Sequence, residues 1–180
     1  MYEVELKVRA AHDGVRNRLG DIGAEPSGTV RQIDTYYDHP VRDFAETDEA
    51  FRIRLEAGGA DGNDSRTRVT YKGPLVDPDS KTREELETEI EDGETMASIL
   101  EALSFEAAAT VEKTRERFRY DGYTITLDSV DGLGEFVEIE TGAEEIDPAR
   151  DGAIELLDRL GLNAEDSIRR SYLGLLLDEE

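Results

Sequence analysis

Charged and apolar residues alternate along eight separate stretches of the chain, and this alternation predicts eight β-strands. Among the first eight residues, the even positions from Tyr2 to Val8 are apolar, whereas Glu3, Glu5 and Lys7 carry charges. Side chains of an extended strand point to its two faces in turn, so one face of this strand is ionic and the other is apolar. The same pattern recurs at residues 29–38, 51–56, 65–73, 81–91, 111–120, 123–128 and 135–140.

Apolar residues at helical spacing predict about four helices, two between the strands and two after them. We expect the first to begin at an Asp13 cap and to end at Gly23, and the third to begin at Asp147-Pro148. The second helix and the last, which starts near residue 164, should each present one apolar stripe. These stripes are Met96, Ile99, Leu100 and Leu103, and then Ile168, Tyr172 and Leu175.

The turns between the strands predict antiparallel neighbours. Residues 58–64 are rich in glycine, and Asp121-Gly122 is a strong hairpin signal, while residues 41–48 read as a polar connection. Eight such strands favour one antiparallel sheet that closes into a barrel. The 180 residues are therefore expected to form a single domain, 1–180, of the α+β class, mainly β.

The distribution of charge indicates which face of the sheet points inward. An ordinary barrel hides its apolar faces, but basic residues gather on three strands of this acidic chain, and acidic residues gather on the first, fifth and eighth. We therefore favour a barrel or tunnel with a charged interior and with helices over its outer apolar faces; the ordinary barrel is the alternative. The gathered basic residues are Arg52, Arg54, Arg66, Arg68, Lys72, Lys113, Arg115, Arg117 and Arg119.

Composition limits the possible functions. The net charge of −23 repels polyanions and argues against nucleic acid and anionic membranes as partners. Lysine is scarce relative to arginine, and a dispersed acidic surface suggests adaptation to high salt. With no membrane-length apolar run and no signal-like start, we expect a soluble cytoplasmic protein. The chain has no cysteine, so any metal must bind oxygen or imidazole; His12 and His39 read as surface or loop residues.

The opening strand has the chemistry of a site for metal and phosphate. Glu3 and Glu5 lie about 7 Å apart on one face of a strand, and carboxylate oxygens are ligands that hard divalent cations prefer. Arginine and lysine bind phosphate oxygens. Charges inside a barrel are too costly unless they pair with each other, with water or with a ligand. The pattern therefore predicts a polyanion that binds together with Mg²⁺ or Mn²⁺.

A series of motifs resembles the CYTH superfamily of triphosphate tunnel metalloenzymes. That superfamily includes class IV adenylate cyclases, thiamine triphosphatases and inorganic triphosphatases. The similarity covers nearly the whole chain, and the order of the motifs makes it more specific than any one of them. The motifs are Glu3-x-Glu5-x-Lys7, residues 32–38, Phe51-Arg52-Ile53-Arg54, Thr70-Tyr71-Lys72-Gly73-Pro74, Arg83-x-Glu85-x-Glu87, Val111-x-Lys113-x-Arg115, and Leu127-Asp128 with residues 133–140.

The resemblance implies a role for each matching position. It implies metal binding by Glu3, Glu5, Asp128, Glu138 and Glu140, with Glu3, Glu5 and Glu138 as the first choices. Triphosphate binding is implied for Lys7, Arg52, Arg54, Lys72, Lys113 and Arg115. Glu5, Lys7 and Asp128 are the candidate catalytic residues. Arg83, Glu85 and Glu87 match a tunnel strand without an individual role.

The stretches around Lys72-Gly73-Pro74 and Lys113-x-Arg115 look most like the class IV cyclase branch, including its archaeal relatives. The expected function is therefore conversion of ATP to cyclic AMP and pyrophosphate with Mg²⁺ or Mn²⁺. An inorganic, thiamine or nucleoside triphosphatase would use the same residues. A polyphosphate-binding module without turnover is the third possibility, and a homodimer is expected from the resemblance alone.

Overall fold

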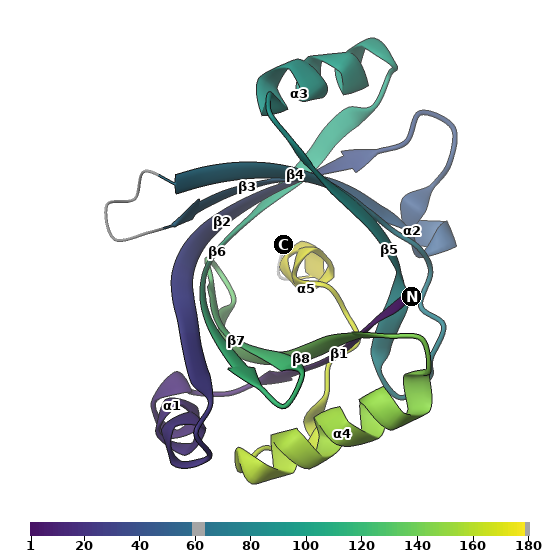
Figure 1. The fold of residues 1–180 in the computed structure, drawn as a ribbon. Helices are drawn as coiled ribbons and strands as arrows, with labels where there is room; N and C mark the ends of the chain where they lie inside the picture. The colour runs from purple at the N-terminus through teal and green to yellow at the C-terminus, as the bar shows by residue number, and fades with distance from the viewer. Residues whose placement is uncertain (59–63, 179–180) are drawn as a thin grey trace.

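The computed structural model describes residues 1–58 and 64–178, and its strands form a closed antiparallel barrel (Figure 1). The strand order is β1-β5-β4-β3-β2-β6-β7-β8, and pairing of β8 with β1 completes the ring. The predicted fold class is therefore confirmed, although residues 59–63 of the predicted 58–64 turn lie outside the described residues. The strands are β1 (Tyr2–Arg9), β2 (Glu25–Asp38), β3 (Ala50–Gly58), β4 (Asp64–Lys72), β5 (Lys81–Ile90), β6 (Glu106–Tyr120), β7 (Tyr123–Val130) and β8 (Gly134–Ala143).

The described residues contain one short helix that the sequence pattern does not predict. This helix, α2 (Phe44–Thr47), lies in the stretch expected to be a polar connection. The side chain of Asp43 stabilises its start by accepting hydrogen bonds from the backbone N–H groups of Ala45 and Glu46. The other helical elements are α1 (His12–Asp21), α3 (Gly93–Ala102), α4 (Ile146–Arg159), the 3₁₀ turn η1 (Ala164–Asp166) and α5 (Tyr172–Asp178).

The predicted cap of the first helix is wrong. α1 begins at His12 after Ala11, which makes no side-chain cap, so Asp13 lies inside the first turn. There its negative charge still favours the positive end of the helix dipole. Asp147 likewise lies in the first turn of α4, because Glu145 occupies the capping position.

Two expectations about burial are also wrong. In the predicted stripe of α3 only Leu100 is buried, whereas Ile99 and Leu103 are 47% and 61% exposed, because the helix packs on the end of the barrel through few residues. His12 is not a surface residue: it is 5% exposed, and its Nε2 lies 3.0 Å from the carbonyl oxygen of Phe136.

The last predicted helix is interrupted. Instead of continuing from residue 164, the chain makes η1, extends over residues 167–171, and becomes helical again at α5. The backbone N–H of Ile168 donates a 2.7 Å hydrogen bond to the carbonyl oxygen of Lys7, which fixes the extended link against β1. Local periodicity does not encode a contact between residues so distant in sequence. The interruption leaves Tyr172 buried against the barrel.

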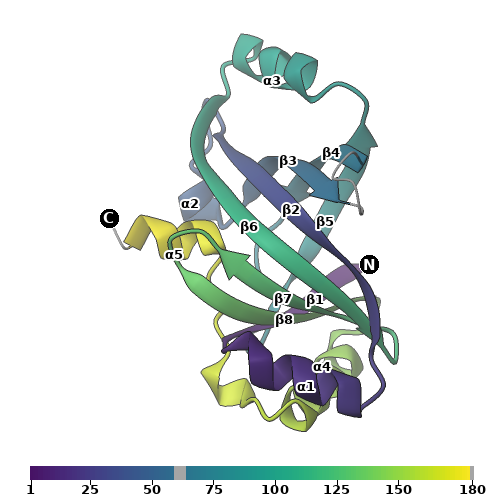
Figure 2. The same cartoon turned by 90° about the vertical axis from the view of Figure 1, so that its left-hand side faces the viewer.

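Helices cover the outer apolar face of only part of the barrel. α1 and α4 pack below β1, β7 and β8 (Figures 1 and 2), while Leu55 on β3 and Leu86 on β5 remain 43% and 69% exposed. The predicted covering therefore holds for the first group of strands and only in part for β3, where α3 packs in one cluster with Ile53 and Leu55 stays exposed; Leu86 on β5 also stays exposed. The buried cluster under the covered strands is Leu6, Val8, Val15, Leu19, Phe118, Ile125, Leu127, Val137, Ile139, Ala153, Leu156, Leu157 and Leu160.

The charged faces of the strands point into the barrel, as predicted. Lys7 is 1% exposed, while its neighbours on β1 point outward into the apolar core. Arg66 and Arg119 lie near strand ends and are exposed. The buried polar side chains of the interior are Glu5, Lys7, Gln32, Asp34, Arg52, Arg54, Glu56, Thr70, Lys81, Arg83, Lys113, Arg115, Thr126, Asp128 and Glu138.

The register of neighbouring strands places opposite charges side by side in this interior. Asp34 of β2 lies opposite Arg54 of β3, and Arg54 donates from Nε and Nη2 to the two Asp34 oxygens at 2.6 and 2.7 Å. Removing one partner of such a buried pair leaves an uncompensated charge, which costs about 3–5 kcal/mol. The pairs therefore make the charged interior compatible with a stable fold.

Glu56 gives a prediction about acid stability. Burial opposes its ionisation, but hydrogen bonds from Arg117 and Gln32 and the charge of Arg117 outweigh that effect and lower its pKa from 4.5 to about 2. A carboxylate with a lowered folded pKa stabilises the fold above its unfolded pKa, and this contribution is lost as the pH falls through the folded value. The relevant window therefore extends from about pH 4.5 down to pH 2.

We expect Glu56→Gln to lower the free energy of unfolding at neutral pH and to flatten its decline across that window, because glutamine does not titrate. Urea unfolding followed by circular dichroism at several pH values measures both effects. Equal declines for the variant and the natural sequence would contradict the assignment of this carboxylate.

Candidate active site

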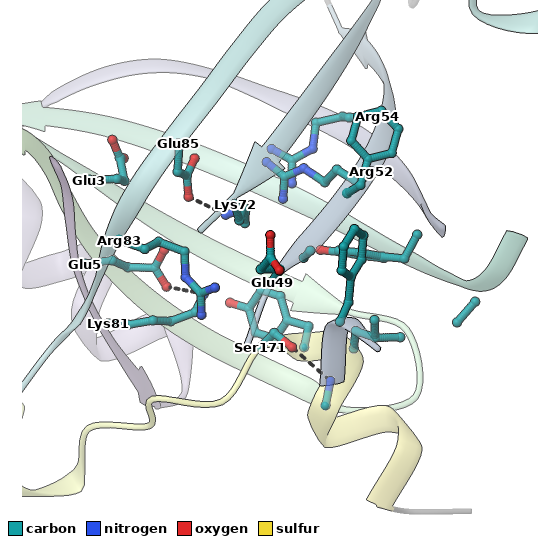
Figure 3. Close-up of a pocket in the computed structure, with 18 of the residues that line it drawn as sticks. Glu3, Glu5, Glu49, Arg52, Arg54, Lys72, Lys81, Arg83, Glu85 and Ser171 are labelled. Atoms are coloured by element: carbon teal, nitrogen blue, oxygen red, sulfur yellow. Dashed lines mark hydrogen bonds and ion pairs between the residues drawn. The ribbon is translucent and has the colours of Figure 1, made fainter. Parts of the chain in front are cut away.

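A cavity of about 830 Å³ occupies the barrel interior. Its walls come from β1 to β6, β8, α2 and α5, and Figure 3 shows acidic and basic side chains projecting into it from several strands. The lining of the cavity is mixed in chemistry. Glu3, Glu140, Arg68 and Arg117 are among its charged residues, and Phe44, Ala108 and Leu177 are among its apolar ones. The size falls within the range of sites for small molecules, roughly 300–1,000 Å³.

Three carboxylates meet on one wall of the cavity. Oxygen atoms of Glu5, Glu138 and Glu140 all lie within 4.8 Å of one another. The pairing of β1 with β8 produces this cluster, since Glu5 lies opposite Glu140, and Glu138 is two residues along the same face. Glu3 lies on that face of β1 as well and also lines the cavity.

The electrostatics of this wall suit a hard cation. Burial, followed by the charges of Glu140, Glu85 and Glu5, raises the pKa of Glu3 to about 8. Burial also raises the pKa of Glu140, and Glu138 adds to the rise. Such carboxyl groups hold protons because too little positive charge offsets them, and a divalent metal bound by oxygen ligands would supply that charge. The donor set therefore fits the metal that the family resemblance implies.

Asp128 lies apart from this cluster. It is fully buried and accepts hydrogen bonds from Nε and Nη2 of Arg115, both at 2.7 Å. The phenol of Tyr172 donates a third, also at 2.7 Å. In this geometry Asp128 orients Arg115, whose Nη2 also donates to Glu138 Oε2 at 2.7 Å. Its predicted role as a metal ligand stays a prediction.

Most basic side chains of the interior already have acidic partners. Lys72 donates to Glu85 at 2.6 Å, and Lys81 donates to Glu5 at 3.1 Å (Figure 3). Lys7 Nζ lies 3.6 Å from Glu138 Oε1. Burial, together with the charge of Lys81, lowers the pKa of Lys7 to about 8 even with these carboxylates nearby.

Lys113 and Arg52 are buried cations that donate no hydrogen bond to a carboxylate; Lys7 and Arg83 share this feature but donate to backbone carbonyl oxygens. Lys113 is 3% exposed, and within residues 1–58 and 64–178 its ammonium has no carboxylate within 4.0 Å. Burial lowers its pKa well below the usual value, and the charge of Arg115 contributes. The guanidinium of Arg52 lies 3.8 Å from Asp34 and 3.9 Å from Glu87, and its Nε has no hydrogen-bond partner. Both line the cavity, so they present unused donors to an anion.

The remaining predicted residues also line the cavity but are engaged elsewhere. Arg83 donates to the carbonyl oxygens of Asp48 and Gly73 at 3.2 and 2.7 Å and thereby holds two loops together. Glu87 accepts a 2.7 Å hydrogen bond from Thr70. The cavity therefore brings together every predicted site residue except Asp128.

Lys81 also lines the cavity but is not among the predicted site residues, although its position in the strand could have identified it. Lys81 has the same strand parity as Arg83, Glu85 and Glu87 and lies opposite Glu5 in the β1–β5 register. It is 9% exposed and lines the cavity. Because Lys81 is the first residue of β5, its place on the inward-facing side of the strand was not recognised from the alternation. Tyr172 was missed for a different reason, because its place depends on the interrupted helix described above.

A closed barrel whose interior sets a carboxylate cluster against buried cations has the architecture of a triphosphate tunnel enzyme. The CYTH domain matches residues 1–172, and the chain belongs to the CYTH family of metal-dependent tunnel enzymes. No helix in the part of the chain that the structure describes is long and apolar enough to cross a bilayer.

Individual relatives extend over the same length. The Methanocaldococcus jannaschii protein named "Putative adenylate cyclase MJ0240" is 40% identical over 179 residues, which cover 97% of this chain and 98% of that protein. Adenylate cyclase CyaB of Aeromonas hydrophila is 27% identical over 180 residues, with 97% and 88% covered. The solved structure of the PH1819 protein of Pyrococcus horikoshii is 42% identical with a TM-score of 0.89 and covers 99% of both chains.

The carboxylate cluster predicts a measurable metal affinity. Glu5→Gln removes one charged ligand while keeping the shape of the side chain, so we expect Mn²⁺ to bind at least about tenfold more weakly, a loss of roughly 1.4 kcal/mol. Titration of free Mn²⁺ by electron paramagnetic resonance measures the affinity. Glu84→Gln, on the exposed outer side of β5, is the matched control. Equal affinity in Glu5→Gln and the control would remove Glu5 from the metal site.

Proposed function

We propose that the protein is a class IV adenylate cyclase that converts ATP to cyclic AMP and pyrophosphate with Mg²⁺ or Mn²⁺. The observation that carries this proposal is that two buried cations share one cavity with the carboxylate cluster: Lys113, which has no carboxylate within 4.0 Å among the described residues, and Arg52, whose acidic neighbours lie 3.8 and 3.9 Å away. A ligand that satisfies both walls must bring negative charge for the cations and positive charge for the acids. A metal-bound triphosphate does so. The names of the relatives from M. jannaschii and A. hydrophila support the cyclase among the family's reactions.

The phosphate groups would bind the cationic wall. Lys113 and Arg52 offer unused N–H donors at buried positions, where charge-assisted hydrogen bonds are stronger than at a surface. Arg115 is held rigidly by Asp128 and Glu138, so it would meet a phosphate oxygen with little loss of side-chain freedom.

The metal would be held by Glu5, Glu138 and Glu140, with Glu3 beside them. A divalent cation there would neutralise phosphate charge and favour ionisation of the ribose 3′-hydroxyl. Because Lys81 and Lys7 both lie next to these acids, they would also keep the carboxylates oriented toward the cavity.

The cyclase reaction forms a bond between the ribose 3′-oxygen and the α-phosphorus and breaks the bond between that phosphorus and the bridging oxygen. The 3′-hydroxyl proton is released, and pyrophosphate leaves with added negative charge. Preorganised cations around a leaving group stabilise that charge in the transition state. This is the role we assign to Lys113, Arg52 and Arg115. Glu5 and Lys7 would orient the ribose and the α-phosphate, and Asp128, which does not line the cavity, would act through Arg115.

The product formed from ATP tests the proposal. Incubation with ATP and Mn²⁺ should give cyclic AMP and pyrophosphate in equal amounts, resolved by chromatography. Free phosphate without cyclic AMP would replace the cyclase by a triphosphatase that uses the same tunnel. Tight binding without any product would indicate a polyphosphate-binding module. Running the reaction at low and at high salt controls for repulsion between the acidic surface and ATP.

Lys113→Ala tests the anion site independently of turnover. Tripolyphosphate with Mg²⁺ at a hundredfold excess over its dissociation constant should stabilise the natural sequence by roughly 2.7 kcal/mol, and Lys113→Ala should lose most of that gain. Without ligand the variant should be as stable or slightly more stable, because a buried unpaired charge has gone. Thermal melts with and without ligand measure both. Arg119→Ala, at an exposed position of the same strand, should keep the full gain, and a full gain in Lys113→Ala would contradict the site.

A further inference from the structure

Tyr172 brings an aromatic side chain into the charged interior. It is the first residue of α5, which Figure 1 shows nearly end-on within the ring of strands and Figure 2 shows at one side of the barrel. The side chain is buried, packs edge-to-face on Phe136 with ring centroids 5.0 Å apart, and lines the cavity. The match to the CYTH domain ends at this residue.

The hydroxyl of Tyr172 acts on an arginine through a carboxylate. It donates to Asp128 Oδ2 at 2.7 Å, and the same oxygen accepts a hydrogen bond from Arg115 Nη2. Asp128 is fully buried, so its position depends on these donors. The phenol therefore helps to fix the plane in which the Arg115 guanidinium lies.

The ring of Tyr172 acts on two lysines. Lys7 Nζ lies 3.9 Å and Lys113 Nζ 4.8 Å from the ring centroid. The negative face of an aromatic ring attracts an ammonium without neutralising its charge. A carboxylate in the same place would compete with a phosphate for these cations, whereas a ring holds them in position and leaves their N–H groups available.

These contacts form a closed circuit of side chains. Tyr172 binds Asp128, Asp128 binds Arg115, and Arg115 donates to Glu138 at 2.7 Å. Glu138 lies 3.6 Å from Lys7 Nζ, which returns to the face of the Tyr172 ring. Tyr172 takes part in this circuit through a hydrogen bond from its hydroxyl and through a cation–π contact of its ring.

The segment before Tyr172 is anchored firmly enough for such a role. Ile168 N–H donates to the carbonyl oxygen of Lys7, and Lys7 Nζ donates back to the carbonyl oxygen of Arg170 at 3.0 Å. Arg169 donates to the carbonyl oxygens of Asp77 and Ser80 at 2.7 and 3.2 Å. The link is therefore tied both to β1 and to the loop before β5.

We propose that Tyr172 is a positioning residue for the bound triphosphate: its hydroxyl orients Arg115 through Asp128, and its ring holds Lys7 and Lys113 toward the phosphates. This inference rests on the proposed function, since it assigns a task within the same cavity. The hydroxyl and the ring of Tyr172 have separate effects in this proposal, and two substitutions distinguish these effects.

Tyr172→Phe removes the hydroxyl and keeps the ring. We expect kcat for product formation from ATP to fall about tenfold with KM little changed, because Arg115 loses its orientation in the transition state. Tyr172→Leu removes both, so the dissociation constant for tripolyphosphate with Mn²⁺ should also rise about tenfold. Calorimetric titration gives the dissociation constants, and product chromatography gives the rates.

Leu175→Ala is the matched control, because Leu175 lies on α5 and packs against the same apolar cluster as Tyr172 but is not among the cavity lining residues. It should leave both constants within about twofold of the natural protein. If it matched Tyr172→Leu, or if both Tyr172 variants kept natural kcat and affinity, the positioning role would be overturned. Should Tyr172→Leu fail to fold, the split between kcat and KM in Tyr172→Phe decides alone.

The binding measurement separates failure of this inference from failure of the proposed function. If the natural sequence bound no tripolyphosphate, both would be overturned. If it bound the ligand with product formation and the Tyr172 variants behaved like Leu175→Ala, only the inference about Tyr172 would be overturned.

Discussion

Compensation of buried charge is the constraint on which this structure depends. A barrel that turns its charged faces inward places ionised groups where water screens them poorly, and each group without a partner costs several kcal/mol. Strand register meets most of this requirement by placing Asp34 opposite Arg54 and Arg115 opposite Asp128. The pairs that result are bidentate and short, so they are the rigid part of the interior. What the register leaves uncompensated indicates where a ligand should bind.

The uncompensated groups lie on two sides of one cavity and have opposite signs. Glu3 on β1 and Glu140 on β8 hold protons more tightly than usual because their pKa values are raised, and Lys113 holds its proton less tightly. Both shifts have the same physical origin, since burial disfavours the charged form wherever no opposite charge is near. A ligand that is itself a pair of opposite charges, an anion with its metal, relieves both at once. The specificity that we propose for a metal-bound polyanion therefore rests on the acidic and the basic groups together and on neither alone.

The sequence predicts those parts of this arrangement that follow from the alternation of apolar and charged residues along each strand. Period-two patterns locate every strand, and the segregation of acids from bases indicates that Glu5, Lys7 and Lys113 point inward. Features that depend on contacts between residues far apart in the sequence cannot be predicted from such local patterns. Lys81 becomes part of the site through its register opposite Glu5, and the extended link before Tyr172 depends on a hydrogen bond to the backbone of Lys7. The exposed face of α3 and the buried His12 are errors of the same kind, because burial depends on which neighbour packs there.

The acidic exterior and the cationic wall of the interior act on a ligand at different distances. A net charge of −23 repels bare polyanions over about a Debye length, roughly 10 Å at 0.1 M salt, so the surface opposes the ligand that the interior attracts. A triphosphate that carries its divalent cation has less negative charge and meets a weaker barrier, and added salt shortens the range of that barrier further. The contacts that we propose with Lys113 and Arg52 would act only after the ligand is inside, where screening is weak. On this proposal, the metal that satisfies the carboxylates would also favour the approach of the phosphates, which would couple metal binding to triphosphate binding before any bond is made or broken.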